Sequence, residues 1–554
     1  MMLDPVSMDK SRPRVAIIGA GVSGITMAIN LKNQLGFENF VLYEKASSVG
    51  GTWRDNTYPG CSSDVSGHWY SLSSELNPNW DSYYISQAEI RSYWERLHEK
   101  HNLLAHTVFN TRVDQVEWND QASVHKITLQ DTITGERRET CAEIVIQAVG
   151  AFTTPLFPKD LPGVEKFKGP LWHSLKWRHD VDLKGKRVGV IGNGCSAAQF
   201  VPIIAADPTV EVINFGRSRQ WFAPKGQYRY PRWVKWAFAH VPILLRAYRN
   251  SIMIRSDLGW FMYQSQLPVS KLVKMAFTKY MKDTAPTQYQ DALIPSYPPG
   301  CKRIIVDPGY LSALHQPNVD LVWEGVAEIV EEGVKLKNGE SIPLDIVILG
   351  TGFLLVTRDV AFRGVNGITL DKYFESQGGA TGYRGTVFPG FPNIFTVVGP
   401  NAGSGHASLL FSIEVQAQYV CKLIRPILEG KTKSLEVTVE ATNKYNAWIQ
   451  KRMRNTVFLD CFSYYRGDGR DGVRNIATFP GMMSLFWWIT RNPHWDDFRA
   501  VGGERWTQQR RRNGMLVRWG ALAALLIVAL PLINRNSAAV WAILSRLKPG
   551  FLSG

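Results

Sequence analysis

The segment Gly50–Asp64 combines glycines, aromatic rings and a carboxylate in a pattern suited to a flat cofactor. It reads Gly-Gly-Thr-Trp-Arg-Asp-Asn-Thr-Tyr-Pro-Gly-Cys-Ser-Ser-Asp. The two leading glycines allow the backbone to approach a cofactor closely, and Trp53 and Tyr58 present flat apolar surfaces. The Tyr-Pro-Gly turn is expected to bring Asp64 near the same cofactor. The segment begins six residues after Glu44, which ends a dinucleotide-binding fingerprint.

This first fingerprint has its elements in the expected order. A short apolar strand is followed at once by Gly19, Gly21 and Gly24, then by an amphipathic helix and a second strand that ends at Glu44. In such a unit the first glycine makes a tight turn, the second lets the backbone approach a pyrophosphate, and the third allows close helix packing. The acidic residue accepts hydrogen bonds from a ribose hydroxyl. We therefore predict a nucleotide site at residues 14–44.

A second fingerprint follows an apolar strand predicted over residues 186–191. It has the GxGxxA form, made of Gly192, Asn193, Gly194, Cys195, Ser196 and Ala197. The next strand, predicted over 210–215, ends in Gly216-Arg217-Ser218-Arg219, with no acidic residue where Glu44 stands in the first unit. Arginines there suit a 2′-phosphate, which favours NADPH over NADH. The alternative is that Arg217 and Arg219 are only solvent-exposed residues at the end of a strand. Two sites of different preference predict a flavin and a nicotinamide that exchange a hydride.

Further motifs give the chain a family resemblance over roughly residues 14–500. Phe167–Trp177 matches the pattern FxGxxxHxxxW, and Asp345–Phe353 matches a strand and turn that return the chain towards the cofactors. With the two fingerprints, they make the sequence resemble the FAD- and NADPH-dependent Baeyer–Villiger monooxygenases of the flavin-containing monooxygenase superfamily. Trp177 separates these enzymes from relatives that oxidise heteroatoms. Arg178 departs from the family pattern, which usually has Pro or Asp there.

The resemblance also implies roles for individual residues. Arg303, in Gly300-Cys301-Lys302-Arg303, corresponds to a catalytic arginine, with Asp64 as its orienting partner. The alternative for Arg303 is an ordinary surface strand residue. The FAD contacts implied, beyond Gly19, Gly21, Gly24 and Glu44, are Gly51, Thr52, Trp53, Arg54, Asp64, Tyr70 and the backbone of Val113. The NADP contacts implied, beyond the second glycine motif, are Ser62, Ser63, Arg217, Ser218 and Lys302. No metal site is expected.

In this family the reduced flavin traps O₂ as a peroxyflavin. An anionic peroxide attacks a ketone carbonyl, and a nearby guanidinium favours that anion and stabilises the tetrahedral adduct. The resemblance thus implies Baeyer–Villiger oxidation of a lipophilic ketone to an ester or lactone, in fungal secondary metabolism. Two alternatives remain open: hydroxylation or N- or S-oxidation on the same scaffold, and a non-catalytic flavoprotein. His173 is expected to be a packed histidine that transfers no proton.

The composition indicates which partners and which cellular compartment suit the protein. The chain has 554 residues and a formal net charge of +15. Eight basic residues and no acidic residue lie between Arg505 and the end. Because apolar sequence follows this basic cluster, an anionic membrane is favoured over nucleic acid as a partner. The six cysteines are widely spaced and fit neither a zinc site nor a disulfide framework, which predicts a reduced cytosolic setting.

The expected fold is α/β, with two Rossmann-like dinucleotide-binding domains, a helical insert and a C-terminal membrane segment. Stiff proline-rich sequence after a strand at 143–148 marks the first exit from the FAD domain. The predicted organisation is an FAD-binding domain at 1–155 and 356–504, an NADPH-binding domain at 156–219 and 301–355, a helical insert at 220–300, and a basic segment with a membrane tail at 505–554. A helix is predicted over 409–428.

Two segments suggest contact with a membrane. Residues 229–255 hold six Lys or Arg and no acidic residue, and the insert is interpreted mainly as a cap over the active site, with a membrane-resting surface as the alternative. In the tail, residues 519–534 are uncharged and span about 24 Å as a helix, against roughly 27 Å for an endoplasmic-reticulum bilayer. A single-pass anchor over about 516–534 is predicted, with the catalytic part in the cytosol and the endoplasmic reticulum as the membrane. A helix packed on the domain is the alternative.

Overall fold

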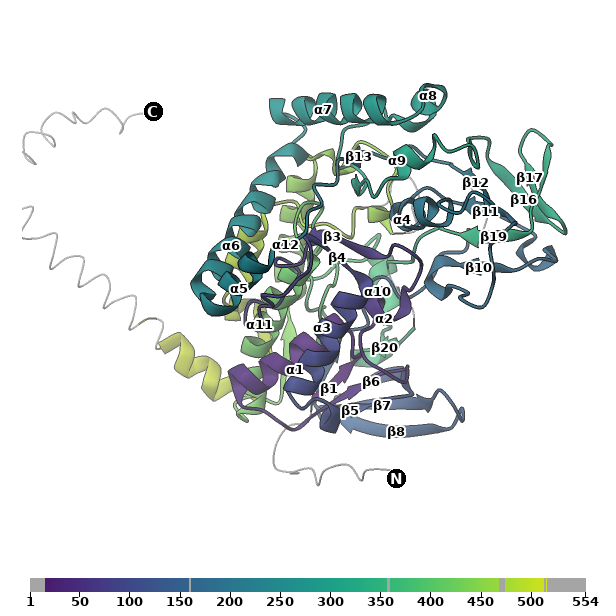
Figure 1. The fold of residues 1–554 in the computed structure, drawn as a ribbon. Coiled ribbons are helices and arrows are strands. Elements are labelled where there is room, and N and C mark those ends of the chain that lie inside the picture. The colour runs from purple at the N-terminus through teal and green to yellow at the C-terminus, as the bar shows by residue number, and fades with distance from the viewer. Residues whose placement is uncertain (1–14, 159–160, 356–358, 468–473, 513–514, 516–554) are drawn as a thin grey trace, which may run out of the picture.

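The computed structural model describes residues 15–158, 161–355, 359–467, 474–512 and 515. Two five-stranded parallel sheets dominate the molecule, and Figure 1 shows them in its lower and upper parts. The predicted membrane tail at about 516–534 lies outside the described residues. Within the described ranges, no helix is both long enough and apolar enough to cross a bilayer.

The first sheet contains the first glycine motif. Its strands, in spatial order, are β21 (Ile394–Thr396), β9 (Ile144–Gln147), β1 (Val15–Ile18), β2 (Phe40–Tyr43) and β5 (Thr107–Val108). Alternate residues of β1 enter different cores, since side chains of a strand point to opposite faces. Val15 and Ile17 pack with the helices α1 (Val22–Leu35), α3 (Gln87–Lys100) and α11 (Leu409–Leu428). Ala16 and Ile18 pack on a second, mostly antiparallel sheet. That sheet consists of β20 (Ala361–Arg363), β6 (Thr111–Asn119), β7 (Val124–Asp131) and β8 (Arg137–Ala142).

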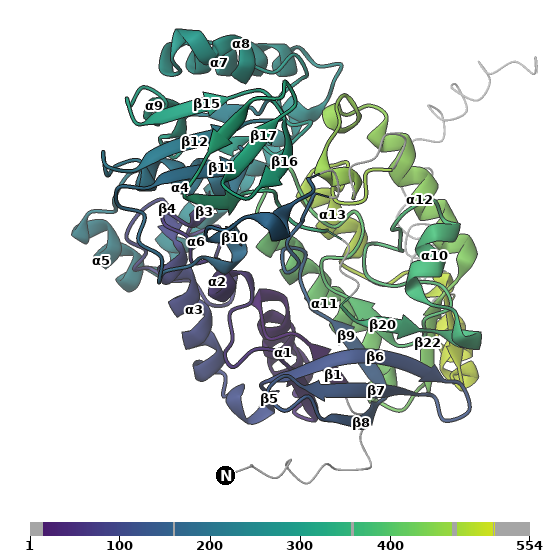
Figure 2. The same ribbon diagram turned by 90° about the vertical axis from the view of Figure 1, so that its right-hand side faces the viewer.

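The second parallel sheet repeats this plan. Its strands, in spatial order, are β10 (Leu171–His173), β19 (Ile346–Leu349), β11 (Arg187–Ile191), β12 (Glu211–Phe215) and β15 (Val319–Val322). Helices α4 (Cys195–Ile204) and α9 (Tyr310–Ala313) cover one face. The antiparallel strands β16 (Val326–Val330), β17 (Gly333–Leu336) and β18 (Ser341–Pro343) cover the other face, and Figure 2 shows them over β11 and β12.

Two chain segments that join the sheets lie side by side. Leu156 N–H donates to the carbonyl of Gly352, and Leu354 N–H donates to the carbonyl of Thr154. Thr351 Oγ1 also donates to the Leu156 carbonyl at 2.6 Å. The crossings at 154–156 and 351–354 therefore form one paired connection between the two sheets.

Helices between the second sheet and Arg303 form the insert. They are α5 (Arg232–His240), α6 (Pro242–Leu258), α7 (Pro268–Thr284) and α8 (Gln290–Leu293), with a 3₁₀ turn, η4 (Gly259–Tyr263), after α6. The remaining helices are α2 (Thr52–Asp55), α10 (Leu370–Ser376), α12 (Val439–Met453), α13 (Met483–Thr490) and a helix at 504–512. Short strand pairs complete the fold: β3 (Ser62–Ser66) with β4 (Tyr84–Ser86), β13 (Phe222–Ala223) with β14 (Ile305–Val306), and β22 (Ser434–Val437) with β23 (Phe498–Val501).

The cysteine interpretation from the sequence is wrong in one respect. Cys301 and Cys461, 160 residues apart, form a disulfide. Their separation gave no local signal, because disulfide partners are defined by the fold and not by spacing. The bond joins the segment that precedes Arg303 to the loop between the 3₁₀ turns η7 (Val457–Leu459) and η8 (Tyr464–Arg466). The argument for a reduced setting from cysteine usage loses its basis.

Candidate active site

The first glycine motif forms a tight cradle at the carboxyl end of β1. Gly19 has a φ of +101°, and a Cβ atom on Gly24 would lie 1.9 Å from the Gly19 carbonyl oxygen. A Cβ atom on Gly51 would lie 3.0 Å from Cα of Gly21. Only residues without side chains allow these three backbone segments to approach so closely. The segment after Glu44 therefore packs directly on the fingerprint, as a shared cofactor site requires.

Glu44 is buried at the end of β2 and joins the parts of this cradle. Its carboxylate accepts hydrogen bonds from the Ala20 N–H at 2.8 Å and the Ala46 N–H at 3.0 Å. Arg54 Nη1 donates to the same carboxylate at 3.0 Å. Burial acts to lower the pKa of Arg54, but hydrogen bonds to Asp55 and the charges of Glu44 and Asp55 raise it overall. The carboxylate of Glu44 is thus held towards the glycine loop by three hydrogen bonds.

The other predicted FAD residues surround this cradle. Trp53 Nε1 donates to the Tyr70 hydroxyl at 2.9 Å, and their rings meet edge to face at 5.5 Å. Burial raises the pKa of Tyr70 to about 12, so its hydroxyl stays protonated. Thr52 begins α2, directly behind Gly51. Val113 is 2% exposed as a whole residue and lies in a core cluster. Its predicted contact with adenine stays a prediction.

The second glycine motif has the same form at the end of β11. Gly192 has a φ of +114°, and a Cβ atom on Gly194 would meet no described atom within 4 Å. Cys195 and Ser196 begin α4, and Ala197 is buried against the sheet. Asn193 Nδ2 donates to the Ser218 carbonyl at 3.0 Å, which brings the end of β12 beside the loop. The open space at Gly194 fits a pyrophosphate at a helix N-terminus.

The predicted 2′-phosphate residues lie close together. The pKa of Lys302 is lowered to about 8, first by burial and then by the positive charge of Arg217. Lys302 Nζ lies 5.2 Å from the ring centroid of Tyr297. Tyr297 in turn donates a hydrogen bond to the Arg219 carbonyl. Two neighbouring cations form a suitable electrostatic site for a phosphate dianion.

The two nucleotide sites meet at the turn that was predicted to present Asp64. Gly60 has a φ of +77°, and a Cβ atom there would lie 2.7 Å from the Gln199 carbonyl oxygen on α4. Gln199 Nε2 donates to the Ser62 carbonyl at 3.0 Å, while Tyr58 donates to Gln199 Oε1 at 3.0 Å. Ser63 is buried and accepts from Val65 N–H at 3.0 Å. Glycine at position 60 thus allows the first site to contact the second.

Arg303 and Asp64 form an ion pair beside this junction. Arg303 donates to Asp64 Oδ2 from Nε at 2.9 Å and from Nη2 at 2.6 Å. The Arg303 side chain is 23% exposed and that of Asp64 is 33% exposed. Asp64 raises the pKa of Arg303 well above its usual value, against the effect of burial. Arg303 is therefore an oriented permanent cation, and the alternative of an ordinary surface residue does not fit.

A carbonyl and several aromatic rings complete the surroundings of Arg303. Nη1 of Arg303 donates to the Gly405 carbonyl at 3.3 Å, which also accepts from the Tyr263 hydroxyl at 2.6 Å. Tyr263 packs near Trp260 and Phe458. Sequence reasoning missed this set. The glycine- and serine-rich run at 402–408, just before the predicted helix at 409–428, was the available signal.

A buried polar chain supports the Gly405 loop from the insert. His406 Nδ1 lies 3.0 Å from Ser404 Oγ, and His406 Nε2 lies 3.4 Å from Asp257 Oδ1 at the end of α6. Asp257 also accepts from the backbone N–H groups that begin α13. The insert, the Gly405 loop and α13 are therefore connected next to Arg303.

His173 and Trp177 belong to the connection between the sheets. His173 Nε2 lies 3.1 Å from the Gly352 carbonyl, and its Nδ1 accepts from Leu175 N–H at 3.1 Å. Burial lowers the pKa of His173 to about 4, so both ring nitrogens are engaged in a neutral ring. Trp177 packs on Phe200 of α4 at 5.1 Å. The expectation that His173 is a packed histidine agrees with this geometry.

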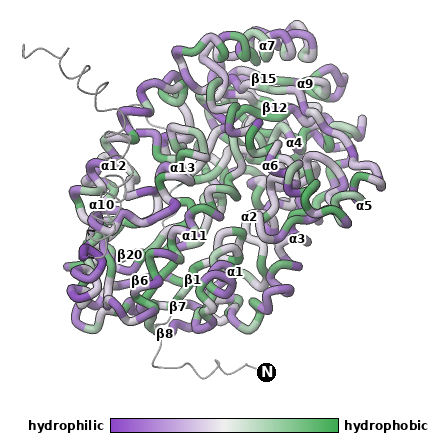
Figure 3. The backbone as a smooth tube through the Cα atoms, turned by 90° about the vertical axis from the view of Figure 1, so that its left-hand side faces the viewer, coloured by the Kyte–Doolittle hydropathy of each residue, from purple (hydrophilic) through white to green (hydrophobic). Residues whose placement is uncertain are grey.

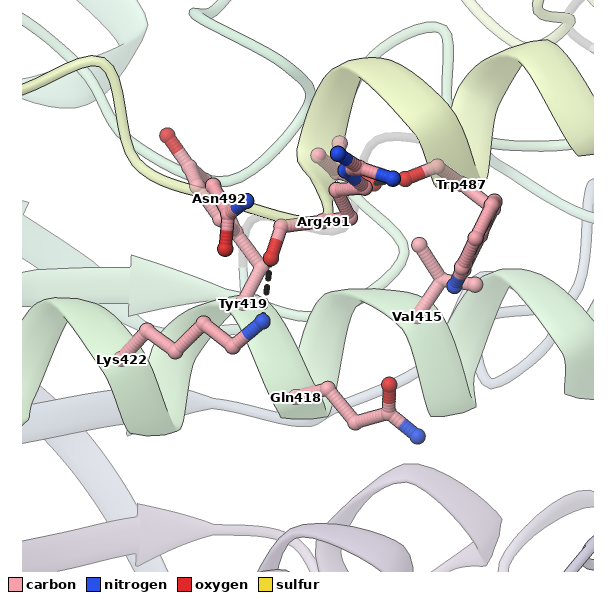
Figure 4. Close-up of a pocket in the computed structure, with 8 residues that line it drawn as sticks. Val415, Gln418, Tyr419, Lys422, Trp487, Arg491 and Asn492 are labelled. Atoms are coloured by element: carbon pink, nitrogen blue, oxygen red, sulfur yellow. Dashed lines mark hydrogen bonds between the residues drawn. The ribbon is translucent and has the colours of Figure 1, made fainter. Parts of the chain in front are cut away.

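A pocket of about 340 Å³ lies apart from these residues, between α11 and α13. Figure 4 shows Lys422 reaching the Arg491 backbone across it, with Trp487 at its edge. Neither glycine motif nor Arg303 lines it. Among the residues that the structure describes, no group of three His, Cys, Asp or Glu side chains could hold a metal ion.

Comparisons with known proteins agree with this architecture and site. A family model described as flavin-binding monooxygenase-like matches residues 12–231. A Baeyer–Villiger monooxygenase of Pseudomonas aeruginosa is 34% identical, over 89% of this chain and 92% of that protein. Another, of Streptomyces coelicolor, is 35% identical over 88% of this chain and 92% of that protein. The solved structure of an oxidized steroid monooxygenase bound to NADP has a TM-score of 0.76 at 24% identity, and covers 89% of this chain and 100% of that chain.

The fold and the site define a flavin monooxygenase with two dinucleotide-binding units. More narrowly, the chain belongs to the Baeyer–Villiger monooxygenases, and the resemblance predicted from its sequence is confirmed.

Proposed function

We propose that this protein uses FAD and NADPH to insert one oxygen atom from O₂ beside the carbonyl of a lipophilic ketone, giving an ester or lactone. The observation that carries the proposal is the Arg303–Asp64 pair, with its two hydrogen bonds of 2.9 and 2.6 Å at the junction of the two glycine-motif units. Family membership and the cofactors named for relatives support the same activity.

The residues present fit both cofactors. The cradle at Gly21 and Gly51, with the Glu44 side chain beside it, suits the adenosine diphosphate part of FAD. The open loop at Gly194, with Arg217 and Lys302 beyond β12, suits NADPH. When bound, FAD reduced by NADPH supplies the oxygen-transfer chemistry with O₂.

Arg303 supplies electrostatic stabilisation. A guanidinium has five N–H donors, and the three hydrogen bonds to Asp64 and Gly405 engage three of them. The remaining donors can hydrogen-bond to an oxygen that gains negative charge as the ketone is attacked. Because Asp64 and Gly405 fix the plane of the guanidinium in advance, little reorganisation is needed during the reaction. Asp64 is a positioning residue in this scheme.

The variant Arg303→Ala tests the proposal. Removing one preorganised donor group of this kind lowers turnover by roughly 100-fold or more, so ketone oxidation should collapse. Reduction of FAD by NADPH should persist, because Arg303 lies outside both glycine motifs. Arg303→Lys is the matched control, because lysine retains the charge but lacks the planar fork of donors. Its rate of ketone oxidation should lie between those of the unchanged protein and Arg303→Ala. Unchanged ester or lactone yield from Arg303→Ala would refute the assignment.

The lipophilic character of the substrate is supported by the rings near Arg303. Trp260, Tyr263 and Phe458 are each at most 4% exposed and pack within one cluster. We expect kcat/KM to rise along a series of 2-alkanones of increasing length, because each buried methylene adds about 0.8 kcal/mol. A preference for short polar ketones would contradict this substrate class. A role in fungal secondary metabolism remains part of the proposal, supported by the lipophilic class and the sequence resemblance.

We also propose a single-pass membrane anchor in the tail, with the catalytic part in the cytosol at the endoplasmic reticulum. Its support is the uncharged stretch at 519–534 between Arg518 and Arg535, with basic residues before it. Carbonate extraction should leave the full chain in the membrane, and a chain ending at Arg512 should be released. Release of the full chain, with no change on truncation, would overturn the anchor.

A further inference from the structure

The outer side of the helical insert exposes an unusual number of large apolar side chains. Figure 1 shows α6 leading from α5 to α7 along this side of the molecule. Trp233 is 72% exposed, Ile243 is 74% exposed and Met275 is 67% exposed. We call this surface the insert face. Its exposed apolar residues are Trp233 and Trp236 on α5, Ile243, Leu244, Ile254 and Leu258 on α6, Phe261 on η4, and Val269, Leu272 and Met275 on α7.

These side chains do not contribute to the core. The three helices are attached by other residues. On α5, Phe238 packs on His68. Helix α6 buries Leu245 and Ile252, and α7 buries Met281 and packs Phe277 on Trp221. The outward residues of α7, Val269, Leu272 and Met275, are three residues apart, and this spacing places them on neighbouring positions of one side of the helix. Exposed large apolar side chains gathered on successive elements of one insert indicate an interaction site.

The charge on the insert face is mainly positive, with Asp283 as an exposed acidic residue at the end of α7. Between Arg229 and Lys282 the chain has ten Lys or Arg residues, and its one acidic residue is Asp257. Asp257 is 7% exposed and accepts backbone hydrogen bonds from α13, so it does not offset the surface charge. The exposed basic residues include Arg232 on α5, Arg246 on α6, and Lys271 and Lys282 on α7.

One side of α7 forms a basic hollow within the face. The hollow measures about 540 Å³ and is lined by Lys271, Lys274, Met275, Thr278, Lys279, Lys282 and Asp283. Lys279 pairs with Asp283 at 2.7 Å, and Lys271 and Lys282 of the same helix are also exposed. Such a site has the charge and the mixed apolar lining to contact a phosphate that carries acyl chains.

We propose that the insert face rests on an anionic phospholipid bilayer. Interfacial helices combine a basic side with exposed Trp, Leu and Ile, and the aromatic rings insert at the headgroup level. Figure 3 shows hydrophobic and hydrophilic residues alternating along these helices. A nucleic acid would pair with the lysines but leave Ile243, Ile254 and Leu272 exposed to water, whereas a bilayer satisfies both the charges and the apolar side chains.

The insert face is also close to Arg303. Phe261 of η4 is 43% exposed at the face, while Tyr263 of the same turn donates to the Gly405 carbonyl that Arg303 contacts. A ketone dissolved in the bilayer would therefore meet the surface one 3₁₀ turn away from Arg303. This consequence for substrate delivery rests on the proposed function, whereas lipid binding does not.

The test is hydrogen exchange of the full chain with vesicles of phosphatidylcholine alone or with one third phosphatidylserine. Peptides from α5, α6 and α7 should exchange more slowly with the anionic vesicles, and this protection should be lost in 0.5 M salt. The variant Arg232→Glu/Arg246→Glu/Lys271→Glu should lose the protection. The control Arg138→Glu/Lys184→Glu/Lys186→Glu makes the same charge change on exposed residues far from the insert and should keep it.

The readout is independent of the membrane tail and of catalysis. A tail that anchors the chain alone would give sedimentation with both vesicle types and no protection of α5–α7, which would overturn the proposal. Protection that depends on protein concentration without vesicles would assign the face to a second copy and also overturn it. If the variant loses protection but oxidises detergent-solubilised ketone normally, the lipid site is supported. Protection without any ketone oxidation would refute the proposed function and leave the lipid site intact.

Discussion

The two nucleotide-binding halves of this enzyme share one plan and differ at the end of a single strand. Each has a five-stranded parallel sheet with helices on one face and a small sheet on the other. In each, a glycine with positive φ ends the first strand: Gly19 in one and Gly192 in the other. At the end of the next strand, the first half has buried Glu44 and the second has exposed Arg217. We propose that the sheet positions a nucleotide and that the residue at the strand end selects which one.

The residues at the two strand ends also differ in how much they contribute to folding. Glu44 is 4% exposed and bonds to the glycine loop and to Arg54, so cofactor choice and stability are coupled in the first half. Arg217 is exposed, and it acts electrostatically on Lys302, which comes from a distant segment of the chain. We therefore expect mutations at the first strand end to affect folding, and mutations at the second to affect mainly nicotinamide selectivity.

The largest effect should come from giving the first glycine loop the residue that the second already has. Gly24→Ala would place Cβ 1.9 Å from the Gly19 carbonyl oxygen, so the backbone must move. We expect a loss of about 4 kcal/mol in the free energy of unfolding and loss of FAD. The reciprocal change Ala197→Gly should cost about 1 kcal/mol. Denaturant unfolding and the FAD content of purified protein measure both. A Gly24→Ala enzyme with full FAD would show the two loops to be interchangeable.

The next effect should come from the buried carboxylate. Glu44→Gln removes one of the two carboxylates that pair with the Arg54 side chain, which is 12% exposed, and leaves Asp55 as the other. Breaking a buried pair on one side costs about 3 kcal/mol, and FAD affinity should fall with it. Its matched control lies in the second half: Glu211 pairs with Arg187 at 2.9 Å, but the side chains are 47% and 36% exposed. Glu211→Gln should change stability by less than about 1 kcal/mol. Equal losses in thermal unfolding would contradict the proposed asymmetry.

Nicotinamide selectivity should change when Arg217 is removed. A hydrogen bond to a charged group contributes about 1.5 to 3 kcal/mol, so Arg217→Ala should raise KM for NADPH roughly 10- to 100-fold and leave KM for NADH unchanged. Arg219→Ala is the control, because Arg219 contacts Tyr297 through its backbone carbonyl, which the variant retains. Steady-state kinetics with both nucleotides measures the ratio. A parallel rise for NADH would mean that Arg217 supports the fold rather than the phosphate.

Most of the scaffold could be predicted because its signals are local. The helix predicted at 409–428 has those bounds in the structure, where Ser408 caps its first turn. The Arg303–Asp64 contact was inferred from family resemblance, although 239 residues separate the pair. The disulfide between Cys301 and Cys461 and the contact of His406 with Asp257 had no local pattern. Such pairs are determined by how distant segments pack, which spacing along the chain does not encode.

The pH dependence of nicotinamide binding should give the smallest and most specific effect. The pKa of Lys302 is lowered to about 8 by burial and by Arg217. Below pH 8 Lys302 is protonated and attracts the 2′-phosphate, and above it the charge is lost. Phosphate binding favours the protonated form, so KM for NADPH should rise as pH increases from 8 to 9.5, while KM for NADH should not. For each pH unit above the pKa of Lys302, KM for NADPH should rise by a factor of ten at most.

Lys302→Arg sharpens this comparison, because an arginine keeps its charge throughout this range. KM for NADPH should then be flat from pH 7 to 9.5, and Lys302→Ala should be flat at a higher value. The first strand end carries a carboxylate in place of a lysine, and Glu44 there is bonded to Ala20, Ala46 and Arg54. A pH-dependent KM that survives in Lys302→Arg would assign the titration to another group, and the pairing of Lys302 with Arg217 at the phosphate would be refuted.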